Sequence, residues 1–407
     1  MKKRKHKKAQ DALSRRNFLS KTGAGIGGLA LTPLALDATS SSERKPKEKT
    51  HPLAGVEAEW RNRNEEMSYR MLGRTGMMIS EVVSGGDPVR SDNYQQVHYA
   101  LEKGLNYLDM APAYGKGDCE TAYSKVIDSS SMRAKVFMTT KVSGFTDVRS
   151  SLYQDIFKGL PSEKQNAILK RANEIRAERG IDKPGYFIRY WPGQKRSNDS
   201  SYLANAMVKD YGHKVDGSKA FRKKIKDSLE GSLSRAKTDY FDILMCPHGA
   251  NCPEEVQIPE IYETFKELKK EGKVRFLGVS THNDPAGVLR AATATGEYDV
   301  VMCAYNIANG GYLEDAIANA YQSGMGIIAM KAAMAVATHH KAIQPIPQWR
   351  IDKVNRIVPG NLKAPMKAYV WALQNPHISA VISNLWDKQF IDENLSLAGM
   401  KVELADG

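Results

Sequence analysis

The sequence predicts an α/β protein built as a (β/α)8 barrel, or TIM barrel, with a long insertion after the third strand. From Ser68 onward, short apolar runs alternate with amphipathic segments, which is the pattern of a parallel sheet covered by helices. The apolar runs number eight. Without residues 144–216, this part of the chain has the usual length of such a barrel, about 250 residues.

The eight expected strands are bounded by turn residues or by helical patterns. They are, in chain order, ISEVVSGG (79–86), NYLDMAP (106–112), VFMTTKV (136–142), YFDILMCP (240–247), VRFLGVST (274–281), VVMCAYNI (300–307), GIIAMKAA (326–333) and AVISNL (380–385). Helical patterns follow the strands, most clearly at 218–237, 255–272 and 387–399.

The insertion, residues 144–216, is far too long for an ordinary βα loop. It contains a helical pattern at 162–180 and an aromatic stretch, GYFIRYWPGQ, at 185–194. Because it directly follows strand three, we expect it to rise from the end of the barrel where catalytic groups gather. Its aromatic residues either form a wall of the substrate site or pack on the barrel; they are Tyr186, Phe187, Tyr190 and Trp191.

The N-terminal region has the features of an export signal. It combines a basic head with an apolar stretch of about 15 residues, which is too short to span a bilayer. SRRNFLSK (14–21) closely resembles the twin-arginine export signal, in which Arg15 and Arg16 precede Phe18 and Leu19. A disordered basic tail is the alternative. We expect a signal peptide over 1–38, a polar linker over 39–67 and a barrel over 68–398, exported to the periplasm by the twin-arginine machinery without a membrane span in the mature form.

Charge and cysteine content argue against several other functions. The net charge is +13, but residues 1–50 alone contain 13 lysines and arginines against 4 acidic residues. The rest of the chain is therefore only weakly basic, and we expect no nucleic-acid partner. Cys246, His248 and Cys252, with Cys119, suggest a metal site or a Cys246–Cys252 disulfide. Small apolar cysteines in a barrel strand are the simpler interpretation, so we predict no metal.

Four polar residues stand at the ends of successive strands. Asp109 and Tyr114 follow strand two, Lys141 ends strand three and His248 follows strand four. Each alone has a structural explanation, since a strand-end lysine is often a solvated cap and a lone histidine is often structural. Catalytic groups of a (β/α)8 barrel, however, gather at the C-terminal ends of its strands.

In order and position, these four residues resemble the Asp-Tyr-Lys-His tetrad of the aldo-keto reductases. The resemblance covers most of the barrel and includes YRMLGRTGMMISEV (69–82), LKKEGKVRFLGVSTHN (268–283), YNIANGG (305–311), GIIAMK (326–331) and DEN (392–394). It implies an oxidoreductase that transfers hydride between NADP or NAD and a small carbonyl or alcohol substrate.

The chemistry of carbonyl reduction accounts for these residue types. The carbonyl oxygen needs a proton donor, and a nearby ammonium lowers the pKa of a tyrosine. We therefore expect Tyr114 to be the acid/base, Lys141 to lower its pKa and Asp109 to hold Lys141. His248 is expected to orient the substrate carbonyl.

The resemblance implies a set of residues in contact with the cofactor, and at some of these positions this chain has a different residue type from the family. They comprise Ser280, Thr281, Met302, Met330, Ser383, Asn384, Lys388, Glu393 and Asn394. Met302 stands where the family has a glutamine and Met330 where it often has a tyrosine. Trp386 replaces the arginine expected near the 2′-phosphate and Asp387 adds a like charge, so the sequence leaves NADP and NAD both open.

These departures leave a second function class open. The chain is either an exported reductase or a cofactor-impaired barrel that acts as a periplasmic binding protein or holds a different ligand in the same pocket. Copurified NAD(P) would distinguish the two.

Overall fold

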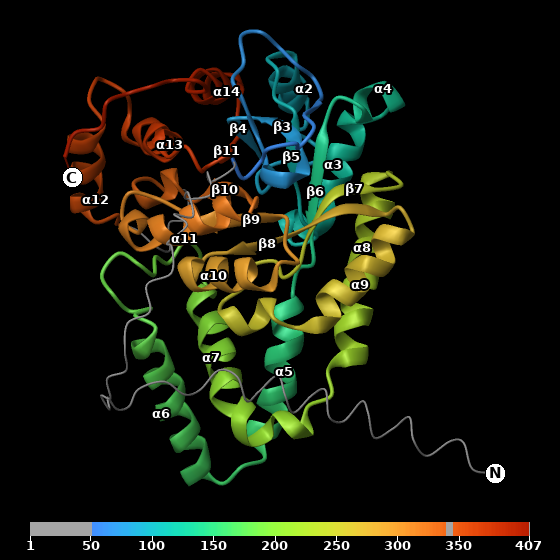
Figure 1. Ribbon diagram of the computed structural model, residues 1–407, viewed down its shortest axis with the longest axis vertical. Helices are drawn as coiled ribbons and strands as arrows, with labels where there is room; N and C mark the ends of the chain where they lie inside the picture. Colours follow the sequence, from blue (N-terminus) through green and yellow to red (C-terminus); the bar gives the residue numbers. More distant parts are fainter. Residues whose placement is uncertain (1–50, 339–344, 407) are drawn as a thin grey trace, which may run out of the picture. The chain divides into compact units, whose positions relative to one another are not determined.

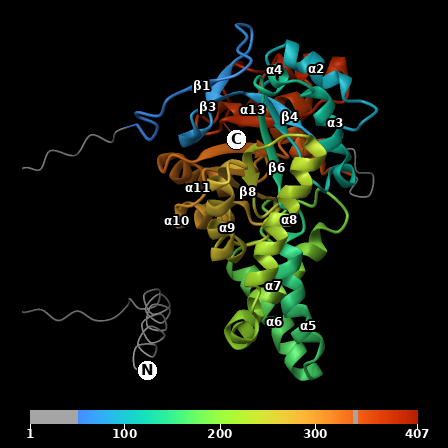
Figure 2. The same cartoon turned by 90° about the vertical axis from the view of Figure 1, so that its right-hand side faces the viewer.

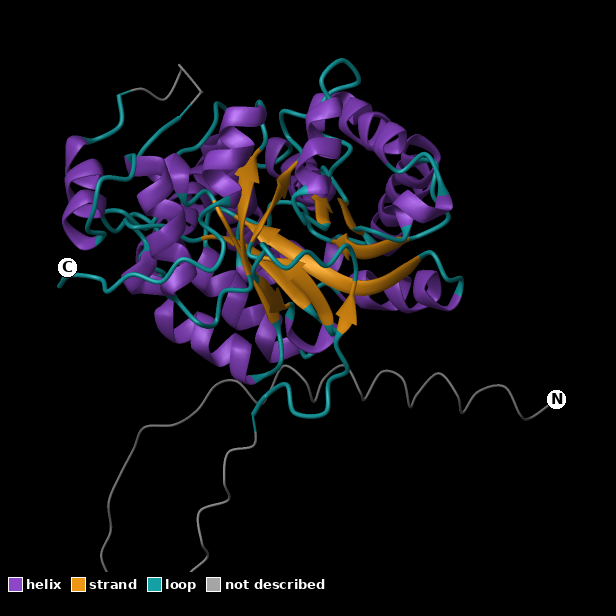
Figure 3. Cartoon of the chain, turned by 90° about the horizontal axis from the view of Figure 1, so that it is seen from above, coloured by secondary structure: helices purple, strands orange, loops and turns teal. Residues whose placement is uncertain are grey.

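The computed structural model describes residues 51–338 and 345–406. Eight parallel strands close into a barrel, in which each strand pairs with its neighbours along the chain and the last pairs with the first (Figure 1). Seen from above, helices surround the strands (Figure 3). The predicted fold class is confirmed. The barrel strands are β4 (Val82–Gly85), β5 (Tyr107–Asp109), β6 (Phe137–Lys141), β7 (Phe241–Met245), β8 (Val274–Thr281), β9 (Val300–Ala304), β10 (Gly326–Met330) and β11 (Ala380–Asn384).

Each barrel strand except the last is joined to the next through at least one helix. The helices are α2 (Gln95–Glu102), α3 (Asp118–Val126), α4 (Ser130–Arg133), α5 (Phe145–Lys158), α6 (Ser162–Glu178), α7 (Gln194–Tyr211), α8 (Ser218–Ala236), α9 (Pro259–Lys270), α10 (Pro285–Thr295), α11 (Gly310–Gln322), α12 (Gln348–Ile357), α13 (Ala364–Gln374) and α14 (Lys388–Leu395). Their apolar faces and the outer faces of the strands form one large buried core.

A hairpin closes the N-terminal end of the barrel. It pairs β2 (Tyr69–Met71) with β3 (Met77–Ser80), and Leu72, Met77 and Ile79 pack among the apolar side chains inside the barrel. The strand expected at 79–86 is therefore two strands, because Ile79 belongs to this hairpin and the barrel strand starts at Val82.

The hairpin turn approaches the barrel backbone closely at Gly73. A Cβ atom there would lie 2.2 Å from the amide nitrogen of Gly326, and the φ of Gly73 is +53°. Only glycine fits such a position, because it has no Cβ and adopts positive φ without strain.

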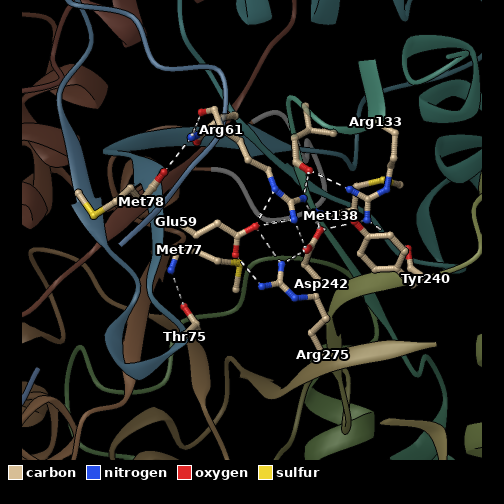
Figure 4. Close-up of polar contacts among 12 residues, drawn as sticks. Glu59, Arg61, Thr75, Met77, Met78, Arg133, Met138, Tyr240, Asp242 and Arg275 are labelled. Atoms are coloured by element: carbon tan, nitrogen blue, oxygen red, sulfur yellow. Dashed lines mark hydrogen bonds and ion pairs between the residues drawn. The ribbon is translucent and has the colours of Figure 1, made fainter. Parts of the chain in front are cut away.

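Residues 51–67, which the sequence assigned to the polar linker, lie in the same compact unit as the barrel. β1 (Glu59–Trp60) pairs with β3. Next to it lie the five residues that we call the basal charge cluster, shown in Figure 4: Glu59, Arg61, Arg133, Asp242 and Arg275. The folded body thus begins earlier in the chain than the expected boundary at Ser68.

The insertion forms α5, α6 and α7, which lie together beside the barrel (Figure 2). α7 packs against both α5 and α6. Buried polar contacts join the insertion to the loop after β7: Ser201 on α7 bonds to Glu255, and Arg179 at the end of α6 pairs with Glu254. The insertion is therefore fastened to the C-terminal side of the barrel.

Arg15 and Arg16 lie outside the described residues, so the export signal stays a prediction. Among the helices of the described ranges, none combines the length and the apolar character that crossing a membrane requires.

Candidate active site

A cavity of about 460 Å³ lies at the C-terminal ends of the barrel strands. Its walls include Asp109 and Tyr114 from β5 and its loop, His248 from the loop after β7, Met302 in the middle of β9 and Met330 at the end of β10. The volume is in the range of small-molecule sites. Catalytic residues of (β/α)8 barrels lie at this end of the strands, so the cavity is the candidate active site.

Asp109 and Lys141 form a buried ion pair beside the cavity. Strand pairing places Asp109 opposite Thr139, two residues before Lys141. The Lys141 Nζ lies 2.5 Å from Asp109 Oδ1 and donates a second hydrogen bond to the Met110 carbonyl at 3.0 Å. Burial raises the pKa of Asp109, and the Lys141 ammonium opposes that rise. The structure brings these two predicted residues together as expected.

Tyr114 follows β5 in a short 3₁₀ turn, and its ring faces the same ammonium. The Lys141 Nζ lies 4.8 Å from the ring centroid, a cation–π contact, and its hydrogen bonds go to Asp109 and Met110. Burial, with the negative charge of Asp109, raises the pKa of Tyr114 well above 10. In the protein without ligands the net pKa of Tyr114 is therefore raised and not lowered, because burial outweighs the nearby ammonium of Lys141. Tyr114 remains a neutral phenol, which is the form that donates a proton.

His248 lies on the other side of the tyrosine ring. The two ring centroids are 5.8 Å apart with an edge-to-face angle of 87°. His248 Nδ1 is hydrogen-bonded to Ser143 Oγ at 2.8 Å, and Nε2 has no partner among the described residues. Burial lowers the pKa of His248 well below 6.5, and the positive charges of Lys141 and Lys331 add to this effect. The imidazole is therefore neutral at neutral pH.

The predicted cofactor residues of strands five, six and seven divide into two groups. Met302 and Met330 line the cavity. Ser280 and Thr281 do not. Their hydroxyls bond to the backbone of the loop after β7, where Ser280 Oγ accepts from Gly249 N–H and Thr281 Oγ1 donates to the Ala250 carbonyl.

After strand eight, Asn384 lines the cavity, whereas the other predicted residues bond elsewhere. Ser383 accepts a hydrogen bond from Asn394 at 2.9 Å, and Glu393 forms an ion pair with Lys363 at 2.7 Å. The Lys388 ammonium lies 4.8 Å from the ring centroid of Tyr99. These residues lie on or beside α14, away from the tetrad.

The cavity fits the nicotinamide end of the cofactor that the resemblance implies. Met302 and Met330 present thioethers beside the tetrad, and a thioether packs well against an aromatic ring. At the N-terminus of α14, the Asp387 carboxylate caps the helix by accepting from Phe390 N–H at 2.9 Å, so this helix end already carries a negative charge.

Two further residues of the cavity wall are His282, which the family resemblance places at the strand-five end that approaches the nicotinamide, and Lys331, which sequence reasoning missed. His282 directly follows β8 and its ring centroid lies 4.7 Å from that of Trp191. Lys331 directly follows β10 and has a left-handed backbone, with φ of +62°. The signal was present in both cases, because each residue follows the last residue of a barrel strand.

The aromatic residues of the insertion take both of the roles that the sequence allowed. Trp191 lines the cavity. Tyr186 and Tyr190 are buried, and their hydroxyls bond to Asp284 and Asn306. Phe187 packs against the core. The insertion therefore supplies one wall residue and several packing residues.

The cysteines serve no metal site in the described part of the chain. All four are free and buried, and no group of three or more histidine, cysteine or acidic side chains is placed to hold a metal ion there.

Comparisons with known proteins agree with this geometry. Residues 76–395 match the model of the aldo/keto reductase family. The chain is 26% identical to the uncharacterized oxidoreductase YqkF of Bacillus subtilis over 53% of this chain and 49% of that protein, so it spans about half of that relative.

Two further relatives carry names that state an activity. The chain is 25% identical to L-galactose dehydrogenase of Arabidopsis thaliana, over 81% of this chain and 88% of that one. It is also 25% identical to NADH-specific methylglyoxal reductase of Escherichia coli, over 45% of this chain and 61% of that one.

Solved structures share the fold. An aldo-keto reductase from Bacillus halodurans aligns with a TM-score of 0.53 at 18% identity, over 82% of this chain and 92% of that one. Because the family match spans most of the barrel, from the hairpin to α14, this chain belongs to the aldo/keto reductase family.

Proposed function

We propose that this protein is an NAD(P)-dependent carbonyl reductase that also catalyses the reverse alcohol oxidation, with Tyr114 as the acid/base. The observation that carries the proposal is the buried Asp109–Lys141 pair, whose ammonium faces the Tyr114 ring at the wall of the cavity that His248 also lines. Family membership supports an oxidoreductase. One relative is named a dehydrogenase and another an NADH-specific reductase, which supports a nicotinamide-dependent reaction in either direction.

Tyr114, Lys141 and Asp109 together carry out the proton transfer. A reduced nicotinamide, when bound, supplies the hydride that no side chain can deliver. Tyr114 is protonated and donates its phenolic proton to the carbonyl oxygen as that oxygen gains charge. The Lys141 ammonium stabilises the phenolate left on Tyr114, and Asp109 holds the ammonium in place.

His248 positions the substrate. It is neutral, and its Nδ1 is held by Ser143, so Nε2 faces no competing protein group among the described residues. A hydrogen bond from Nε2–H to the carbonyl oxygen aligns this oxygen with the Tyr114 hydroxyl. Trp191 and the two methionines exclude water from the apolar part of the cavity.

The test is reduction of a panel of aldehydes and ketones by the full chain with NADH and with NADPH, followed by the loss of nicotinamide absorbance. We expect turnover with at least one carbonyl and loss of turnover in Tyr114→Phe. Absence of turnover with both cofactors across the panel would contradict the proposal.

The second candidate function is a binding protein that retains the tetrad but exchanges no cofactor. Met302 offers no hydrogen bond to a carboxamide, and Ser280 and Thr281 are engaged with backbone groups. Mass spectrometry of the ligand released from gently purified protein distinguishes the reductase from the binding protein. A nicotinamide nucleotide at near-stoichiometric level supports the reductase. Its absence, together with failure to bind added NADH or NADPH, supports the binding protein.

We also propose export by the twin-arginine route, with the cofactor enclosed before export. The support is the SRRNFLSK segment with Arg15 and Arg16. Cell fractionation of the native chain and of a variant with both arginines replaced by lysine tests it, and equal export of both chains would contradict it.

A further inference from the structure

Lys331 is a cation in the cavity wall that the proposed chemistry leaves without a role. Its ammonium makes no ion pair among the described residues, and its one hydrogen bond there goes to the weak acceptor Met334 Sδ at 3.4 Å. Lys331 is half-buried, and a cation partly removed from water is costly unless an anion or strong acceptor compensates it. The missing partner is therefore expected to come from a ligand.

The surroundings of Lys331 hold the ammonium over aromatic rings. Its Nζ lies 5.8 Å from the ring centroid of Tyr190 and 5.7 Å from that of Trp191. Both rings belong to the insertion. The backbone of Lys331 is left-handed, at φ of +62°, which is uncommon for a residue other than glycine.

His282 provides a second, independent sign of a missing ligand. It is nine-tenths buried, lines the cavity, and its Nδ1 has no hydrogen-bond partner. Its ring packs edge-on against Trp191. An unpaired buried nitrogen is destabilising, and a hydrogen bond to a ligand oxygen or N–H group removes that cost.

The acidic residues of the cavity wall leave Lys331 without an ion-pair partner. Asp109 is already paired with Lys141. Asp87 and Asp147 also belong to the wall, but both side chains are exposed and neither forms an ion pair with Lys331. The carboxylates of Asp87 and Asp109 favour the charged form of Lys331, whereas burial lowers its pKa.

We propose that Lys331, His282 and Trp191 form a subsite for a carboxylate on the substrate, so that the favoured substrates are aldehydes or ketones that carry a carboxylate a few bonds from the carbonyl. This inference rests on the proposed reductase function and names its substrate class. The source is the substrate and not the cofactor pyrophosphate, because the ammonium faces the insertion aromatics and lies close enough to His248 and Lys141 to affect the reacting end.

The test compares 4-oxobutanoate with its methyl ester, which has the same aldehyde and nearly the same length but no charge. With the full chain and NADH, we expect wild type to favour the anion by about 10- to 100-fold in kcat/KM, mostly through KM, since a charge-assisted hydrogen bond is worth that factor. Lys331→Met removes the preference, so that the anion and the ester are used with similar kcat/KM. Lys331→Arg retains most of it.

Lys237→Met is the matched control, because Lys237 is also a lysine with positive φ, at +49°, but it ends α8 at the opposite end of the barrel. We expect it to leave both substrates unchanged. Equal use of both substrates by wild type would overturn the proposal. An equal loss for both in Lys331→Met, together with weaker NADH binding, would also overturn it by assigning Lys331 to the cofactor pyrophosphate.

A binding measurement separates failure of this inference from failure of the proposed function. If neither aldehyde is reduced, the reductase proposal fails, and succinate binding followed by tryptophan fluorescence still tests the subsite. Binding that weakens about tenfold or more in Lys331→Met, with the signal lost in Trp191→Phe, supports the subsite. Succinate binding that is absent or equal in wild type and Lys331→Met overturns it.

Discussion

The two ends of this barrel differ in whether every charged or polar group removed from water has a partner. At the N-terminal end, the carboxylate of Asp242 is fully buried and pairs with Arg61, Arg133 and Arg275 at 2.6–3.2 Å. At the C-terminal end, Lys331 has no ion pair among the described residues and His282 has an unpartnered nitrogen. Paired charges join elements of the fold, whereas unpaired ones are available to a ligand. In this barrel, therefore, the unpaired groups lie at the end that holds the cavity, beside the paired Asp109 and Lys141.

The comparison is clearest for two tyrosines that each lie under a cation. The Lys141 Nζ is 4.8 Å from the Tyr114 ring centroid, and the Arg133 guanidinium carbon is 4.1 Å from that of Tyr240 in the basal region. Neither hydroxyl has a hydrogen-bond partner among the described residues, so Phe at either position removes only the hydroxyl.

The largest expected effect is the loss of activity in Tyr114→Phe. Loss of a general acid lowers kcat by about 10²- to 10⁴-fold, with little change in melting temperature. Tyr240→Phe is the control and should retain full activity. Steady-state kinetics and thermal unfolding of both variants decide the matter, and similar activity in the two would place the proton donor elsewhere.

Asp242→Asn should have the opposite effect to Tyr114→Phe, because it should lower the stability and leave the activity unchanged. It leaves three arginines around a neutral group, which costs on the order of 3 kcal/mol in the free energy of unfolding. The folded variant should reduce carbonyls at the wild-type rate, because the change lies far from the cavity. Urea unfolding and kcat measure the two effects; a wild-type midpoint with impaired kcat would contradict the division between the two ends.

The third expected effect is a dependence of stability on pH that originates at the C-terminal end. Burial, with Lys331 and His248 nearby, lowers the pKa of His282 well below 6.5. Below pH 6.5 the unfolded chain takes up a proton that the folded chain does not, so stability is lost as pH falls, by about 1 kcal/mol per unit for a fully buried group.

Unfolding free energies measured between pH 7 and 5.5 test this slope. His282→Asn should have a shallower slope than wild type, whatever its stability at pH 7. Identical slopes in the two proteins would show that His282 does not titrate differently on folding.

The smallest expected effect concerns the choice of cofactor. Asp387→Ser keeps an oxygen at the N-cap of α14 but removes its negative charge. If a 2′-phosphate binds near this helix, NADPH affinity should rise by about three- to tenfold relative to NADH, with the melting temperature nearly unchanged. Calorimetric titration with both nucleotides checks this, and an unchanged ratio would place the phosphate away from Asp387.

The sequence was sufficient for the barrel and for the tetrad. Eight apolar runs predicted eight strands, and parallel strands bring their C-terminal ends together, so Asp109, Tyr114, Lys141 and His248 were expected to meet. The residue that directly follows a barrel strand also lines the cavity at Lys331. That lysine was missed because a single lysine after an apolar strand is usually a solvated cap.

Other features depend on distant contacts that a local pattern does not contain. Arg61 bonds to Asp242 across 181 positions of the chain, so the end of the expected linker gave no sign that it folds onto the barrel. Ser280 and Thr281 were expected at the cofactor, but the loop after β7 binds their hydroxyls. Which partner those two hydroxyls bind depends on where the tertiary fold places this loop.

The most direct test of the central claim is a single-turnover reaction. Full-chain protein is mixed with NADH and then with 4-oxobutanoate, and the loss of nicotinamide absorbance is followed for wild type and Tyr114→Phe. The account predicts that both proteins bind NADH and that only wild type consumes it rapidly. Failure of wild type to bind either NADH or NADPH, or equal rates in the two proteins, would contradict it.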